Sequence, residues 1–173
     1  NYGYARCHAY RAGRLSSRDA GRANAVRADA LVGLMRVNAG SADAYSRELL
    51  RIHDGQASES VHRAVADMYV RQRNANGALG EARSHLQRTA RALTLINIAS
   101  LGGDSRALLD EAYAADNNSV AVNSALGAAY FNLGSQHWNT ARRHLEFATQ
   151  NGRRPEPGYE NLQLDAFYYL SVL

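Results

Sequence analysis

Apolar residues return every three to four positions along most of the chain, and short turn signals interrupt this period at intervals. The spacing is typical of amphipathic helices, because residues three or four apart share one helix face. No segment between turn signals alternates apolar and polar residues as a half-buried strand would. The stretch 92–99 leans toward strand composition, but its neighbours are helical. The sequence therefore predicts an all-α fold.

Turn signals divide the predicted helices into pairs. Glycine, asparagine and aspartate cluster between the helical runs, at 38–41, 74–77, 102–104 and 116–119. Connections this short between helices of about 10–20 residues favour antiparallel neighbours, and hence stacked hairpins. Four residues precede a helical run and are expected to be helix N-caps: Ser41, Ser58, Asp104 and Ser119.

Composition excludes several classes of protein. A chain of 173 residues, 46% of them hydrophobic and only 2 of them proline, can bury a core and is not a disordered or fibrous sequence. No run approaches the roughly 20 apolar residues that span a bilayer. The single cysteine, Cys7, can form neither an internal disulfide nor a cysteine-rich metal site. Residues 1–14 carry arginines where a signal peptide has an apolar core, so we expect any such signal to have been removed.

The formal charge of +4 is concentrated at the start of the sequence. Residues 1–27 hold six arginines against one acid, Asp19, with tyrosines between them. Such a segment is suited to phosphates and bases, but no reading motif accompanies it and an exposed helix face shows the same spacing. We therefore expect no nucleic-acid partner. All 20 basic residues are arginine, which indicates a GC-rich bacterial genome.

The segment 116–152 carries the most specific pattern. A Leu-Gly-x₂-Tyr motif is followed by two spaced alanines, at Leu126, Gly127, Tyr130, Ala141 and Ala148. This pattern resembles the tetratricopeptide repeat (TPR), a helix–turn–helix unit of about 34 residues with W-x₂-L-G-x₂-Y followed by A-x₃-F. Asn123 stands at the tryptophan position, and the turn after Gly134 is about two residues longer than the consensus.

The resemblance implies an α-solenoid of stacked antiparallel hairpins, a TPR-like superhelix, forming a single domain over 1–173. A small residue at Gly127 would let the two helices of one hairpin approach closely, and we expect Tyr130 to fill the gap to the next hairpin. Such hairpins stack because they cannot bury their faces alone. The repeats become less clear toward the start of the chain: 119–152 is the clearest, 57–91 and 92–118 are degenerate, and 1–56 is weak.

The six histidines form no metal motif in the sequence. His137 and His144 are seven residues apart, whereas a metal-binding pair on one helix usually has i,i+3 or i,i+4 spacing. Glu81 and His85 have the i,i+4 spacing, but a surface helix pair explains them equally well, and no third ligand accompanies them. We expect no metal and no other cofactor.

No arrangement typical of an enzyme is present. Cys7 and His8 are adjacent, and neighbouring side chains on a helix point about 100° apart, so they cannot act as nucleophile and base. The sequence has no Gly-x-Ser-x-Gly elbow and no glycine-rich phosphate loop. We expect no catalytic residues.

The resemblance also implies a concave groove that binds an extended peptide or a helix of a partner protein. The family's groove positions fall on Arg63, Asp67, Arg71, Arg91, Thr94, Asn97, Ser124, Ala128, Phe131 and Asn132. The first three also share one helix face, so a self-paired surface ladder is the alternative. Binding of chaperone tails is disfavoured, because the chain has no lysine for the family's carboxylate clamp and has Ala121 and Ala125 at two of the clamp positions.

The last predicted helix, within 159–173, has an apolar face. Four residues form it, Leu162, Ala166, Tyr169 and Leu170, and three others widen it, Leu164, Phe167 and Tyr168. A capping helix is the favoured interpretation, since a solenoid needs its open end covered. A face that docks a partner is the alternative, because exposed apolar patches of this kind mark interaction sites.

The sequence therefore favours a non-catalytic protein–protein interaction scaffold. In a general way it resembles small bacterial TPR lipoproteins, pilotin-like, that assist pilus and secretin assembly. That resemblance implies a secretin or pilus component as partner, and a location in the periplasm or at the inner face of the outer membrane. The alternatives are a cytoplasmic adaptor or secretion chaperone, and an RNA-associated helical-repeat protein.

Overall fold

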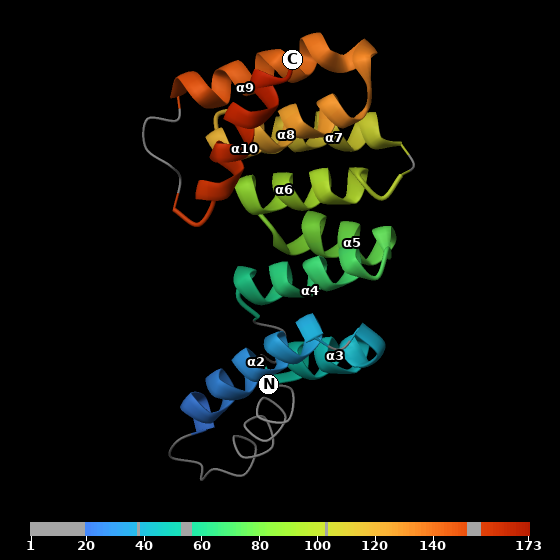
Figure 1. Cartoon of the computed structure of the whole chain (residues 1–173). Helices are drawn as coiled ribbons and strands as arrows, with labels where there is room; N and C mark the ends of the chain where they lie inside the picture. Colours follow the sequence, from blue (N-terminus) through green and yellow to red (C-terminus); the bar gives the residue numbers. More distant parts are fainter. Residues whose placement is uncertain (1–19, 38, 53–56, 103, 152–156) are drawn as a thin grey trace. The chain divides into compact units, whose positions relative to one another are not determined.

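The computed structural model describes residues 20–37, 39–52, 57–102, 104–151 and 157–173. Within these ranges every regular element is a helix, which confirms the predicted all-α class (Figure 1). The contacts divide the chain into two compact units, 1–81 and 82–173. Cys7, His8 and the first four arginines lie outside the described residues.

The first unit contains α2 (Ala20–Val37), α3 (Ala42–Ile52) and α4 (Glu59–Arg71), with a short 3-10 turn, Ala39–Ser41, before α3. Helix α2 packs against α3, and both contact α4. Each helix contributes apolar residues from one face, so the three faces close a common core. The core residues include Leu31, Met35, Leu49, Val65 and Met68.

Helix α5 (Ala75–His85) begins in the first unit and ends in the second. The turn from α4 places Arg73 in the left-handed region, at φ 58°, and the Asn74 side-chain oxygen accepts from the Gly77 N–H at 2.9 Å. A Cβ at Gly77 would lie 2.9 Å from the Tyr69 ring, so only glycine lets α5 start this close to α4. The α4–α5 pair coincides with the degenerate repeat predicted at 57–91.

The second unit continues with α6 (Arg88–Ala99), α7 (Ser105–Ala115), α8 (Val120–Asn132), α9 (Trp138–Asn151) and α10 (Glu160–Ser171). Helix α6 packs on α7, α8 packs on α9, and α10 packs on both α8 and α9. Helix α8 also contacts α6 and α7, which makes it the central helix of this unit. The pairs coincide with the predicted repeats 92–118 and 119–152 (Figure 1).

Three of the expected N-caps occupy that position. The Asp104 side chain accepts from the Ala107 N–H at 3.3 Å, and the Ser119 hydroxyl accepts from the Val122 N–H at 3.1 Å. Ser58 stands at the N-cap of α4 without a side-chain cap bond. Ser41 ends the 3-10 turn that leads into α3.

Gly127 sits at the contact between α8 and α9. A Cβ at this position would lie 2.5 Å from both Cγ and Cδ2 of Leu145, so the close approach predicted for this hairpin is confirmed. The expectation for Tyr130 was wrong in direction: its hydroxyl lies 3.3 Å from Asp110 Oδ1 on α7, in the preceding hairpin and not the next one. Helix α8 contacts α7 as well as α10, and Tyr130 lies on the side that meets α7.

None of the helices in the described part of the chain combines the length and the apolar character needed to cross a membrane.

Candidate functional site

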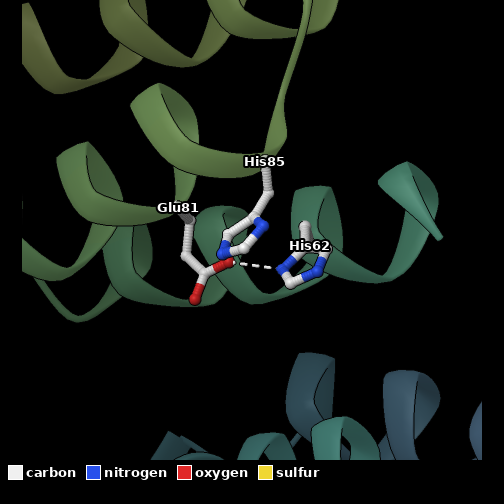
Figure 2. Close-up of side chains that lie close together, drawn as sticks. All are labelled: His62, Glu81 and His85. Atoms are coloured by element: carbon white, nitrogen blue, oxygen red, sulfur yellow. Dashed lines mark hydrogen bonds and ion pairs between the residues drawn. The ribbon is translucent and has the colours of Figure 1, made fainter. Parts of the chain in front are cut away.

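Three side chains that can bind a metal come together on the α4–α5 hairpin: His62, Glu81 and His85 (Figure 2). His62 Nδ1 lies 2.7 Å from Glu81 Oε2. One ligand atom from each of the three residues lies within 4.8 Å of the other two. Glu81 and His85 stand one turn apart on the single helix α5, and that helix fixes where they lie relative to each other.

The three residues differ in burial. The side chains of His62 and Glu81 are 11% and 15% exposed, whereas His85 lies at the surface. Two imidazoles and one carboxylate form a ligand set that zinc uses in proteins. The arrangement supplies the third ligand that the sequence analysis did not find, since His62 precedes Glu81 by 19 residues and only the hairpin brings them together.

A groove of about 370 Å³ lies between α2 and α4 in the first unit. Two of the predicted groove residues, Arg63 and Asp67, line it from α4, and Asp29 and Arg36 line it from α2. Burial raises the pKa of the Asp67 carboxyl above its usual range, against the opposing effect of the nearby arginines. Arg71, the third predicted residue on this helix, is exposed one turn further along α4.

The remaining predicted groove residues lie in the second unit, and two of them are buried. Thr94 and Ser124 are only 2% and 1% exposed, which corrects the expectation that they line a groove. The cause for Ser124 is the position of α8, which is enclosed by α6, α9 and α10. The other five are half-buried or exposed: Arg91, Asn97, Ala128, Phe131 and Asn132.

Aromatic contacts join the end of α8 to its neighbours. The ring of Phe131 stacks on Trp138 with centroids 5.9 Å apart, and it meets Tyr169 of α10 at 5.2 Å. The half-buried Phe131 therefore contacts aromatic residues of its own unit.

The apolar face predicted on the last helix is packed against the rest of the second unit. Ala166 is fully buried, and Tyr169 and Leu170 pack on the cluster formed by Val120, Leu145 and Ala148. Leu162 is half-buried. This face covers α8 and α9, as the capping interpretation expects, so it is not an open docking face. The opposite side of α10 carries the exposed residues Leu164, Phe167 and Tyr168.

A second hollow, of about 390 Å³, lies between α7, α8 and α9. The rings of Tyr130 and His144 are stacked on its wall with centroids 5.7 Å apart, and Tyr113 meets His144 edge-on at 5.3 Å. Burial, together with Arg143, lowers the pKa of His144 below its usual value. This packing of His144 against two tyrosine rings was not predicted from the sequence, in which the residue stands out only as a potential metal ligand.

No protein-family model, no curated protein and no solved structure matches this chain. The TPR resemblance and the envelope role therefore stay predictions.

Proposed function

We propose that the chain is a non-catalytic scaffold that binds an extended segment of a partner protein in the groove between α2 and α4. The observation that carries this proposal is the charged lining of that groove, with Arg36 and Asp29 on one wall and Arg63 and Asp67 on the other. Binding sites are commonly concave and carry a few polar groups that fix the orientation of the ligand.

The electrostatics of Asp67 support a binding role. Burial disfavours the charged form of the Asp67 carboxyl and raises its pKa, although Arg63, Arg71 and Arg36 act in the opposite direction. Groups perturbed in this way are enriched at functional sites. A basic side chain of a partner would stabilise the charged form of Asp67 by pairing with it.

The same lining suggests the chemistry of the partner segment. The planar guanidinium groups of Arg36 and Arg63 match carboxylates in a two-point geometry. Asp29 and Asp67 match lysine or arginine. The expected ligand is therefore a segment in which acidic and basic residues both occur, and a purely apolar peptide is not expected to bind.

The helix hairpins support the finer, TPR-like version of the proposal. The pairs α6–α7 and α8–α9 follow one another, and Gly127 allows the close contact that the repeat consensus requires. In that version the partner belongs to a bacterial envelope machine, such as a secretin or pilus component.

A matched pair of double substitutions tests the groove. Arg63→Ala with Asp67→Ala removes an i,i+4 pair that lines the groove, and Asp43→Ala with Arg47→Ala removes an exposed i,i+4 pair on α3. A photo-crosslinking residue in place of Ser60, which also lines the groove, would capture the bound segment and allow it to be sequenced.

The captured segment is then synthesised and its affinity measured by fluorescence anisotropy. We expect the groove variant to bind at least about 10-fold more weakly, a loss of about 1.4 kcal/mol, and the α3 variant to bind like the parent chain. Equal affinity of the groove variant and the parent chain would contradict the proposal.

A further inference from the structure

We propose that His62, Glu81 and His85 form a binding site for a divalent transition-metal ion, with zinc as the ion that suits them. The proposal is independent of partner binding in the α2–α4 groove. It rests on the convergence of two imidazoles and one carboxylate from the two helices of one hairpin (Figure 2).

The geometry is close to that of a bound ion. Zinc lies about 2.0–2.2 Å from nitrogen and oxygen ligands in a tetrahedral site, which places neighbouring ligand atoms about 3.4 Å apart. The ligand atoms of the three residues already lie within 4.8 Å of one another. Small side-chain rotations, chiefly of the exposed His85, would therefore bring all three to one ion.

The donor types select the class of ion. Neutral imidazole favours zinc, copper, nickel and iron, whereas calcium and magnesium prefer an all-oxygen shell. Three protein ligands leave the fourth tetrahedral position to water. The exposed side of the cluster, at His85, gives an ion and this water access from solvent.

An ion held here would link α4 to α5. His62 belongs to α4, while Glu81 and His85 belong to α5. The hydrogen bond between His62 and Glu81 already joins the helices, and a metal would replace it with bonds that need all three side chains. Because an ion that binds only the folded chain stabilises it, zinc should raise the melting temperature.

The test uses the full chain with any purification tag removed. Isothermal titration with zinc chloride in a non-coordinating buffer should show saturable binding of one zinc ion at this site, and zinc should raise the melting temperature. His85→Gln and Glu81→Gln should each weaken zinc binding by at least about 100-fold, since loss of even a second-shell partner costs 10–100-fold. His85 lies at the surface, so its substitution should leave the circular dichroism spectrum unchanged.

His137→Gln is the matched control, because it removes a histidine outside the cluster. This control should bind zinc like the parent chain. Cobalt(II) provides a second readout: the visible absorption of a protein-bound, tetrahedral ion should appear in the parent chain and be lost in His85→Gln. Two results would overturn the proposal: absence of saturable zinc binding, or equal zinc affinity in the parent chain, His85→Gln and Glu81→Gln.

Discussion

Asn123 Oδ1 lies 2.9 Å from His144 Nδ1, and this contact joins α8 to α9 inside the second unit. A carboxamide oxygen can only accept, so Nδ1 of His144 carries the hydrogen and donates it. The Asn123 amide nitrogen donates in turn to the carbonyl oxygens of Asn117 and Ser119, at 2.8 and 2.9 Å. Asn123, which stands at the tryptophan position of the repeat consensus, is thus buried, and its side-chain oxygen and nitrogen are both hydrogen-bonded.

Replacing Asn123 by alanine should destabilise the second unit by about 1–3 kcal/mol, because it leaves the N–H of the half-buried His144 and the carbonyl of Asn117 without this partner. Urea unfolding followed by circular dichroism measures the change. Asn132→Ala, on the exposed end of the same helix, is the control and should stay within about 0.5 kcal/mol of the parent chain. Equal stability of the two variants would mean that the Asn123 network contributes nothing.

The lowered pKa of His144 predicts a pH-dependent stability. Below the unfolded pKa of about 6.5 the unfolded chain binds more protons at this residue than the folded chain does. The contribution of neutral His144 to the free energy of unfolding is therefore complete above about pH 6.5, and it declines as the pH falls toward the folded pKa. Urea unfolding across this range should show the decline, and His144→Gln should flatten it. His137→Gln should keep the decline, since it leaves His144 in place.

The close approach at Gly127 predicts a cost for the smallest possible side chain. Gly127→Ala should lower the free energy of unfolding by about 1–3 kcal/mol, because its Cβ would overlap the Leu145 side chain. Gly80→Ala is the control: Gly80 is helical, and a Cβ there meets nothing within 4 Å. It should stabilise the chain by about 0.5–1 kcal/mol. If Gly127→Ala melts at the same temperature as Gly80→Ala, the inference of a tight contact between α8 and α9 is contradicted.

Glu111 links two arginines in the second unit, with Oε2 at 2.7 Å from Arg83 Nη2 and Oε1 at 3.0 Å from Arg91 Nη2. The hydrogen bond from Arg83 is the main cause that lowers the pKa of Glu111. Glu111→Gln should nevertheless cost only about 1 kcal/mol or less, since these pairs are partly exposed.

Salt and acid give two further readouts of this network. Raising the salt concentration should reduce the difference between Glu111→Gln and the parent chain. The contribution of Glu111 to the free energy of unfolding should be present above its unfolded pKa of about 4.3, and it should disappear as the pH falls through the folded pKa. If the difference in unfolding free energy between Glu111→Gln and the parent chain changes with neither salt nor pH, the ion pairs are not its source.

The helix pairs could be predicted from the sequence because their signals are local. Gly127 and Tyr130 stand within one turn, and Ser119 and Asp104 cap the helices that immediately follow them. Each of these signals depends on residues close in the chain, so the starts of α7 and α8 followed from them.

The candidate sites could not be predicted to the same depth, because they depend on contacts between distant residues. His62 joins Glu81 only after α4 and α5 have paired. Ser124 was expected on an open face, but the packing of α6, α9 and α10 around α8 buries it. The charges of Arg63 and Asp67 could be read from the sequence, whereas the opposite wall from α2 could not.

The enclosed position of α8 also has a consequence for motion. Its amide hydrogens are shielded by neighbours on several sides, so they should exchange with solvent only when the whole second unit opens. Helix α10 has one side bare, at Leu164, Phe167 and Tyr168, and its amides should exchange through local detachment. The second unit would then lose its structure in a fixed order, with α10 leaving first and α8 last.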